Sequence, residues 1–212
     1  MTIAAEKIPT FADAEAEFER AWADPKNTPF EMPGVDVNKV LAQRYTMNPS
    51  RALTRSMVWD MELKKAWDPK TYIPYVVSSG RSWGRHELPG NYEHFFRASV
   101  QIGWVTHERG NVNEEVFVDR DRRRILFMGR QEMTTDTGET LVASDHQPLF
   151  HVEHAAGGSE ESPLNVWRIV LLTEKREPRF TEPFKAMVET GLLPGFLEIY
   201  IERDLGIALA RR

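Results

Sequence analysis

The sequence predicts an α+β fold, in which a curved antiparallel sheet of about seven strands is wrapped around a long C-terminal helix. Residues 194–212 carry apolar side chains at the three-to-four spacing of a buried helical stripe, and Pro194 suits the first turn of a helix. The chain before them divides into apolar runs separated by turn residues, as in a strand meander. A helix lying across a curved sheet can enclose a cavity, and we look for the function there.

Residues 1–50 are expected to form a helical extension to a main domain over residues 51–212. Thr10 is the expected N-cap of a first helix, because apolar residues recur at helical spacing after it. Residues 25–35 contain three prolines and a glycine, which predicts a linker or wrapping loop. A second, shorter helix is expected over residues 36–45.

The main domain is expected to begin with a strand over residues 51–59, followed by two short helices capped by Asp60 and Asp68. Turn sequences rich in Gly, Asn and Asp then separate six further strand candidates. These strands are predicted at residues 81–88, 94–105, 113–119, 124–133, 140–154 and 164–173.

This order of elements resembles the helix-grip fold of the START-type or SRPBCC superfamily, which includes polyketide aromatase/cyclases and birch-pollen-type allergens. The resemblance covers residues 51–212 and rests on element order, without a diagnostic motif. A nuclear-transport-factor-like (SnoaL-like) cone fold is the competing interpretation, because it also combines N-terminal helices with a curved sheet around a pocket. That fold usually ends on a strand, so the predicted C-terminal helix favours the helix-grip fold.

Composition excludes several classes of function. The 212 residues are 41% hydrophobic with a net charge of −5, and scattered Lys and Arg residues give no basic face for nucleic acid. The absence of Cys excludes disulfides and thiolate chemistry. No apolar stretch suits a membrane span, and residues 1–7 lack the apolar core of a signal peptide, so a cytoplasmic location is expected.

The densest group of ionisable residues lies at residues 145–154 and includes three of the six histidines. Strand alternation places His146 and His154 on the apolar face and His151 on the opposite face, although a bulge at Pro148 would change this parity. We interpret His154, then His146, as candidates for general acid/base catalysis, with His151 as a third. The alternative is that these histidines are only structural.

The sequence predicts neither a metal nor an organic cofactor. The three histidines do not share a strand face, so they do not form an obvious ligand set. Phosphate-binding loops, nucleophile elbows, zinc-protease helices and dinucleotide fingerprints are all missing from the sequence.

Aromatic residues crowd the two short helices and the predicted sheet faces, and such residues bind flat apolar ligands as readily as they fill a core. An arginine in a cavity could also orient a phenolate or carboxylate, although alternation slightly favours an outward direction for Arg97. The substrate-binding candidates are Tyr72, Tyr75, Trp83, Arg97, Trp104 and Trp167.

These observations predict a cofactor-independent lyase, dehydratase or cyclase that acts on a small aromatic substrate, phenolic or polyketide-like, in an internal cavity. The alternative is a non-catalytic carrier or sensor of a hydrophobic small molecule. The expected partner is a small aromatic molecule, with neither nucleic acid nor membrane, and a homodimer is compatible with the sequence.

Overall fold

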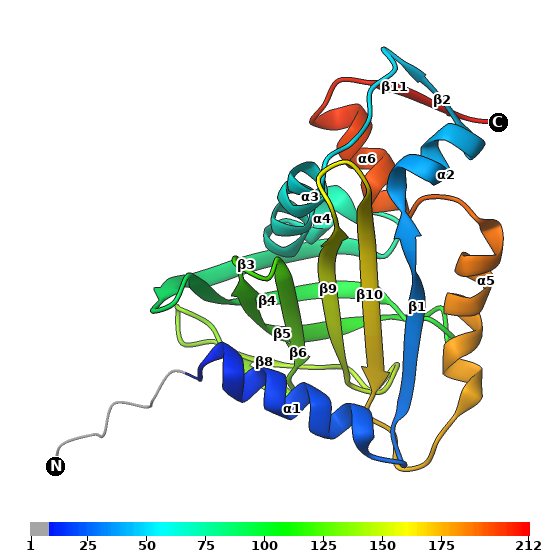
Figure 1. Cartoon of the computed structure of the whole chain (residues 1–212). Coiled ribbons are helices and arrows are strands. Elements are labelled where there is room, and N and C mark those ends of the chain that lie inside the picture. Colours follow the sequence, from blue (N-terminus) through cyan, green and yellow to red (C-terminus); the bar gives the residue numbers. More distant parts are fainter. Residues whose placement is uncertain (1–8) are drawn as a thin grey trace, which may run out of the picture.

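A seven-stranded antiparallel sheet forms the centre of the structure, a computed structural model that describes residues 9–212 (Figure 1). The strand order is β1-β10-β9-β6-β5-β4-β3. The strands span Thr28–Asp36 (β1), Val77–Leu88 (β3), Tyr92–Ile102 (β4), Arg109–Asp119 (β5), Arg124–Gly129 (β6), Phe150–Gly158 (β9) and Pro163–Leu171 (β10).

Six α-helices and two small strand pairs surround this sheet within the described residues. The helices span Phe11–Ala23 (α1), Val37–Arg44 (α2), Arg55–Trp67 (α3), Pro69–Tyr72 (α4), Glu182–Thr190 (α5) and Gly195–Arg203 (α6), and a 3-10 turn spans Pro178–Thr181 (η1). The strand pairs are β2 (Tyr45–Asn48) with β11 (Ala208–Arg211), and β7 (Glu132–Thr134) with β8 (Thr140–Val142).

The predicted α+β class is confirmed, and the architecture is consistent with the helix-grip fold. The cone-fold alternative gains no specific support, since the terminal strand β11 pairs with β2 outside the main sheet. Residues 1–7, which the sequence predicts not to be a signal peptide, lie outside the described residues. None of the helices formed by residues 9–212 is long and apolar enough to span a membrane.

Local capping signals predict several helices correctly. Thr10 and Asp13 form a capping box at the start of α1, in which each side chain bonds the other residue's backbone N–H. Asp36 caps α2, and Asp68 caps α4. Asp60 does not begin a helix, because α3 starts earlier, with Thr54 as its N-cap. The strand predicted at residues 51–59 is therefore wrong.

The predicted linker at residues 25–35 is also wrong, because most of it forms strand β1. This strand pairs with β10 at one edge of the sheet, so its prolines occupy a strand with only one hydrogen-bonded neighbour. The pairing register shifts between Met32 and Val35, around Pro33 and Gly34. The N-terminal fifty residues thus contribute a strand to the main sheet as well as helices.

The long helix predicted over residues 194–212 is shorter than expected. Helix α6 ends at Arg203, and Gly206 follows with a positive φ of 64°, a conformation that glycine adopts without a steric penalty. The chain then turns back and forms β11. The apolar residues of the predicted stripe are therefore divided between a helix and a strand.

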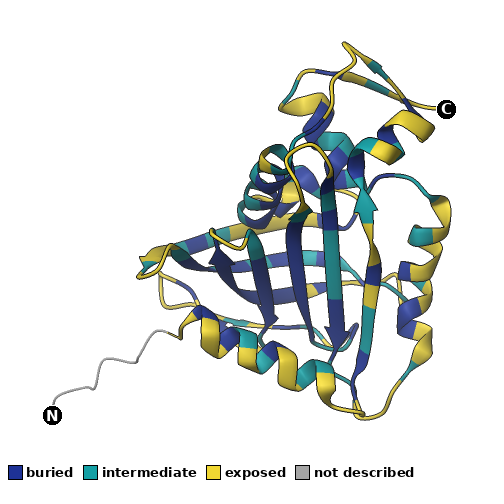
Figure 2. Ribbon diagram, in the orientation of Figure 1, coloured by how far each residue is buried: buried dark blue, intermediate teal, exposed yellow. Residues whose placement is uncertain are grey.

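Both faces of the sheet are covered, as the buried central strands in Figure 2 show. On the outer face, Phe11 and Phe18 of α1 pack against Phe117, Leu126 and Met128 of β5 and β6. Three glutamates of α1 form ion pairs with arginines on this face. The pairs are Glu15 with Arg122 and Arg124, Glu17 with Arg130, and Glu19 with Arg168.

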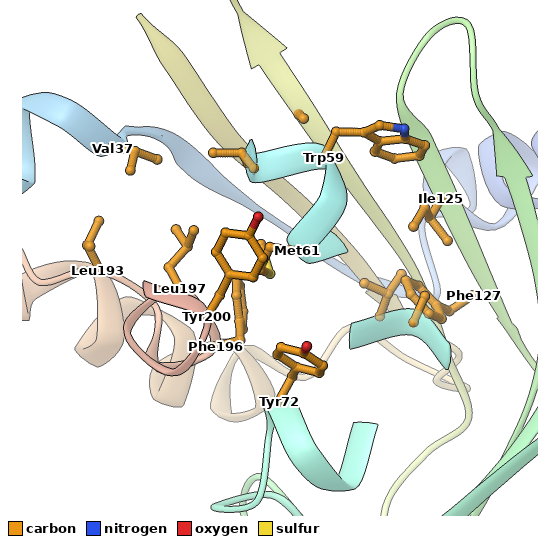
Figure 3. Packing of buried hydrophobic residues seen from close by; sticks show 14 of the residues in the cluster. Val37, Trp59, Met61, Tyr72, Ile125, Phe127, Leu193, Phe196, Leu197 and Tyr200 are labelled. Carbon is orange, nitrogen blue, oxygen red and sulfur yellow. The ribbon is translucent and has the colours of Figure 1, made fainter. Parts of the chain in front are cut away.

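On the inner face, α3, α5 and α6 contribute to the larger hydrophobic core. Figure 3 shows Phe196, Leu197 and Tyr200 of α6 beside Met61 of α3 and Tyr72 of α4. Because Leu197 is fully buried in this cluster, it holds α6 against the rest of the core.

We expect Leu197→Asp to lower the free energy of unfolding by about 3 kcal/mol or more, because it removes apolar burial and places an unpaired carboxylate in the core. Urea denaturation followed by circular dichroism measures this change. The matched control is Glu202→Ala on the exposed side of α6, which should stay within about 0.5 kcal/mol of the parent protein. Equal midpoints for the two variants would contradict the packing role of α6.

Candidate active site

A cavity of about 500 Å³ lies between the inner face of the sheet and the helices that cover it. Apolar and aromatic side chains form most of its wall, including Trp104, Phe127, Val152, Trp167 and Phe196. Its size and lining suit a small organic molecule. Few charged side chains reach the wall from the sheet and α3, and these carry the chemical interest.

A cluster of three buried ionisable residues, the Glu62–Lys65–His154 cluster, lies at this cavity. Glu62 and Lys65 are three residues apart on α3 and therefore share a helix face, and His154 comes from β9. The Lys65 Nζ atom lies 2.6 Å from Glu62 Oε2 and 2.8 Å from His154 Nδ1. Asn165 of β10 donates a hydrogen bond from Nδ2 to Glu62 Oε1, at 2.7 Å.

Burial and mutual charge shift all three pKa values. Burial lowers the pKa of the Lys65 amino group to about 8, against the opposing effect of Glu62. Burial by itself would raise the pKa of Glu62, but Lys65 and His154 outweigh it and bring it to about 2. Burial and the Lys65 ammonium lower the pKa of His154 to about 4. At neutral pH the cluster therefore holds the Glu62 carboxylate, the Lys65 ammonium and the neutral His154 imidazole, and the ammonium loses its proton more easily than that of an ordinary lysine.

Aromatic contacts and the lysine fix the orientation of the His154 ring. The imidazole stacks on Trp167, with ring centres 5.3 Å apart, and contacts the edge or face of Phe127 and Phe196. Because Nδ1 accepts a hydrogen bond from the Lys65 ammonium, we assign the proton of the neutral ring to Nε2. His154 lines the cavity, so its Nε2–H is the donor available to a bound molecule.

Arg97 and Glu114 form a second buried ion pair at the cavity. Arg97 Nη2 lies 2.6 Å from Glu114 Oε2, and Nε donates to the same oxygen at 2.8 Å. Arg97 Nη1 also donates to the carbonyl oxygen of Ala66 in the last turn of α3, at 3.2 Å. The outward direction that alternation favoured for Arg97 is wrong, because β4 has apolar residues on both faces and Phe96, not Arg97, faces outward.

The three predicted catalytic histidines lie in three different places. Only His154 lines the cavity. His151 faces α1, accepts a hydrogen bond at Nδ1 from the backbone N–H of Gly129, and has Nε2 3.5 Å from Glu17. The structure therefore does not bring His151 and His154 together. No group of three or more His, Cys, Asp or Glu side chains within residues 9–212 is arranged to hold a metal ion.

His146 is not on a strand. The strand predicted at residues 140–154 is interrupted, because the chain turns at residues 145–147 before Pro148, which has no backbone N–H for a sheet ladder. The His146 ring packs against Gly110, where an added Cβ would lie 2.2 Å from Nδ1. The alternation argument does not apply across this turn, and His146 is not among the residues that line the cavity.

Some of the predicted aromatic residues line the cavity and others do not. Tyr75, Trp104 and Trp167 line the cavity, and Tyr75 is 51% exposed and lies against Gly195. Trp104 and Trp167 pack on Phe184 of α5, with ring centres 4.9 and 5.4 Å away. These residues form an aromatic wall beside His154.

Tyr72 and Trp83 have contacts elsewhere. The Tyr72 hydroxyl donates to Asp204 Oδ2 at 2.9 Å, which connects α4 to the end of α6. Trp83 stacks on Phe96, on the outer side of the sheet. Neither residue is part of the cavity wall.

Sequence reasoning missed Glu62, Lys65 and Glu114. In the sequence, Glu62 and Lys65 look like an ordinary exposed i,i+3 ion pair on a short helix. The one available signal is the surrounding apolar residues, since a helix whose apolar side chains extend all around must bury some of its charges.

We expect the free energy of unfolding to fall as the pH decreases from about 6.5 through about 4. Burial lowers the pKa of both His151 and His154 to about 4, so the unfolded chain binds more protons than the folded chain in this range. Urea denaturation at a series of pH values measures the slope. His151→Gln should reduce the slope, whereas exposed His86→Gln should leave it unchanged. A flat profile in the parent protein would contradict the assignment of buried neutral rings.

No family model matches the sequence, and no curated protein matches it. Among solved structures, the fold is similar to norcoclaurine synthase from Thalictrum flavum (8% identity, 97% of this chain, 98% of that chain, TM-score 0.48). It is also similar to the Zhui aromatase/cyclase from Streptomyces sp. R1128 (14% identity, 83% and 95%, TM-score 0.47). A third is the di-domain aromatase/cyclase StfQ from the steffimycin biosynthetic pathway (11% identity, 92% and 55%, TM-score 0.45). At these identities the similarity concerns the fold.

Proposed function

We propose that the chain is a cofactor-independent enzyme of the lyase, dehydratase or cyclase type, which transfers protons on a small aromatic substrate held in the cavity. One observation carries this proposal, namely the buried Glu62–Lys65–His154 cluster at a mostly apolar wall. Perturbed ionisable groups gathered in a cavity are typical of catalytic sites.

The energetic argument favours catalysis over simple binding. Removing charges from water is unfavourable, and buried ion pairs are often no more stabilising than apolar residues of the same volume. A carrier of an apolar ligand gains nothing from a carboxylate and an ammonium in its wall. An enzyme that moves protons does gain, because the pair keeps a proton donor next to a neutral imidazole.

His154 is the residue that we place against the reacting atoms. Its Nε2–H can be donated to a substrate oxygen while Nδ1 takes a proton from the Lys65 ammonium, at 2.8 Å. The substrate then gains one proton, His154 remains neutral and Lys65 becomes a neutral amine. The reverse transfers restore the cluster when a proton leaves the substrate. Such a relay serves dehydration or ring closure, in which one oxygen is protonated and one carbon loses a proton.

The cavity wall supports an aromatic substrate. Trp104, Trp167 and Phe196 offer flat apolar surfaces close to His154. Tyr75 and Met187 are partly exposed lining residues and so lie where the cavity meets solvent. Arg97 is already paired with Glu114 and Ala66, so we assign it to shaping the wall instead of binding a substrate carboxylate.

The second candidate function is a carrier or sensor of a hydrophobic small molecule. The mostly apolar lining of the cavity favours it. The two functions differ in turnover, because a carrier releases its ligand unchanged.

We expect His154→Gln to reduce turnover by about 10²-fold or more, because glutamine can still accept a hydrogen bond from Lys65 but cannot relay a proton. Quenching of tryptophan fluorescence first identifies ligands in a panel of phenolic and polyketide-like carbonyl compounds, since Trp104 and Trp167 line the cavity. Chromatography of the products then measures turnover, and ligand affinity should change far less than the rate.

Exposed His86→Gln is the matched control and should keep full turnover. Full turnover by the His154→Gln variant would disprove the relay. Tight binding without turnover of any bound compound would establish the carrier function instead.

A further inference from the structure

The Lys65 amino group is in an unusual place for a lysine. Its residue is 3% exposed, and Nζ lies 3.8 Å from the centre of the Phe196 ring, between Glu62 and His154. The adjacent Lys64 on the same helix forms a partly exposed ion pair with Asp60 and Asp204. Lys65 therefore turns toward the cavity that it lines, while Lys64 provides a natural comparison outside it.

We propose that Lys65 is a nucleophile that forms an imine with an aldehyde or ketone substrate in the cavity. This inference rests on the proposed function of the same site and narrows its substrates to carbonyl compounds. The step needs no co-reactant. The Lys65 ammonium loses a proton to His154, and its nitrogen attacks the carbonyl carbon. A proton then passes from this nitrogen to the carbonyl oxygen, and the resulting hydroxyl group takes the proton back from His154 and leaves as water. The products are a protonated imine and one water molecule, without oxidation or reduction.

His154 is positioned to move the proton in this step. Its Nδ1 lies 2.8 Å from Nζ and can accept the proton that the ammonium must lose before attack. The imidazolium formed in this way can return a proton to the departing hydroxyl group. His154 therefore acts once as a base and once as an acid, and the ring ends the step neutral.

Glu62 compensates the positive charge of the protonated imine, which would be unfavourable in an apolar surrounding without a counter-charge. The imine carries the same single positive charge, on the same nitrogen, as the ammonium that it replaces. Glu62 Oε2, 2.6 Å from that nitrogen, therefore compensates the charge before and after the step. Asn165 holds the carboxylate in place through the other oxygen. The buried charge of the site does not change, so the covalent step carries no new desolvation penalty.

Burial also makes the amine more reactive than an ordinary lysine. It lowers the pKa of Lys65 from 10.5 to about 8. At pH 7 the neutral, nucleophilic amine is therefore roughly two to three orders of magnitude more abundant at Lys65 than at an ordinary exposed lysine. Once formed, the protonated imine withdraws electrons from the adjacent carbon. A proton on that carbon becomes easier to remove, which is the step that ring closure or dehydration requires.

The test is reductive trapping on the full chain. The protein is incubated near pH 7.5 with 2-naphthaldehyde and sodium cyanoborohydride, which converts the imine to a stable secondary amine. Intact-mass spectrometry and peptide mapping then identify the modified residue. We expect one naphthylmethyl group per chain, on Lys65, formed at least about tenfold faster than on Lys64, consistent with the pKa difference.

Two controls distinguish loss of the reactive amine from loss of the folded structure. Lys65→Arg keeps a cation beside Glu62 and should lose the rapid adduct, whereas Lys64→Arg should keep it. If Lys65→Arg does not fold, a competition experiment on the parent protein replaces this variant. An excess of unreactive 2-methylnaphthalene should then slow modification of Lys65 and leave Lys64 unaffected.

Fluorescence quenching by 2-naphthaldehyde without a Lys65 adduct would overturn the inference, as would modification of Lys64 and Lys65 at equal rates. The two proposals fail separately. Loss of turnover in His154→Gln without any adduct on Lys65 would retain the proton relay and reject the imine. A Lys65 adduct together with full turnover in His154→Gln would retain the nucleophile and reject the relay.

Discussion

The attachment of α3 to the sheet is the constraint on which the cavity depends. At the start of this helix, Arg55 Nε donates to the carbonyl oxygen of Ala156 in β9, at 2.7 Å. In the middle, Glu62 accepts from Asn165 of β10. At the end, Arg97 of β4 donates to the Ala66 carbonyl oxygen, one of the carbonyls that a helix end leaves without intrahelical partners. Strands from both halves of the sheet thus hold one helix along its length, and the helix places Lys65 beside His154.

The outer helix α1 supplies the carboxylates that pair with partly buried arginines on the outer side of the sheet. A sheet with one solvated face would leave Arg124, Arg130 and Arg168 in water. Here α1 covers them with Glu15, Glu17 and Glu19, and its phenylalanines seal the strands between the pairs. The sheet is therefore a middle layer in this region. Its inner face carries both the cavity and the larger hydrophobic core, and its outer face carries the smaller one.

The features that could be predicted from sequence are local. The Thr10–Asp13 capping box, the Asp68 cap and the turn-punctuated strands depend on residues a few positions apart. The direction of His154 was also predicted, because its half of the strand is uninterrupted. The directions and the burial of the Arg97 and Lys65 side chains depend instead on residues from distant parts of the chain that pack against them. Alternation presumes that the polar face of a strand is the exposed one, whereas the buried face of β4 carries Arg97, Ser99 and Gln101.

In the C-terminal region, too, a local sequence pattern did not predict the structure. The apolar spacing from Leu197 to Leu209 fits a single helix, but α6 ends at Arg203, and Gly206 with its positive φ lies between α6 and β11. A glycine is compatible with either outcome, so the partner strand β2 decides it. Charged residues at helical spacing are similarly ambiguous. Glu62 and Lys65 would be unremarkable on a solvated helix, and burial alone gives them a chemical role.

The two ion pairs of the cavity, Glu62 with Lys65 and Arg97 with Glu114, sum to zero charge. Each of these two carboxylates already has its cation, so neither pair offers an unpaired charge to an ionised guest beside His154. The desolvation penalty for such a guest is several kcal/mol. The part of the wall next to His154 therefore favours a neutral group of a bound molecule over an ionised group of the same shape.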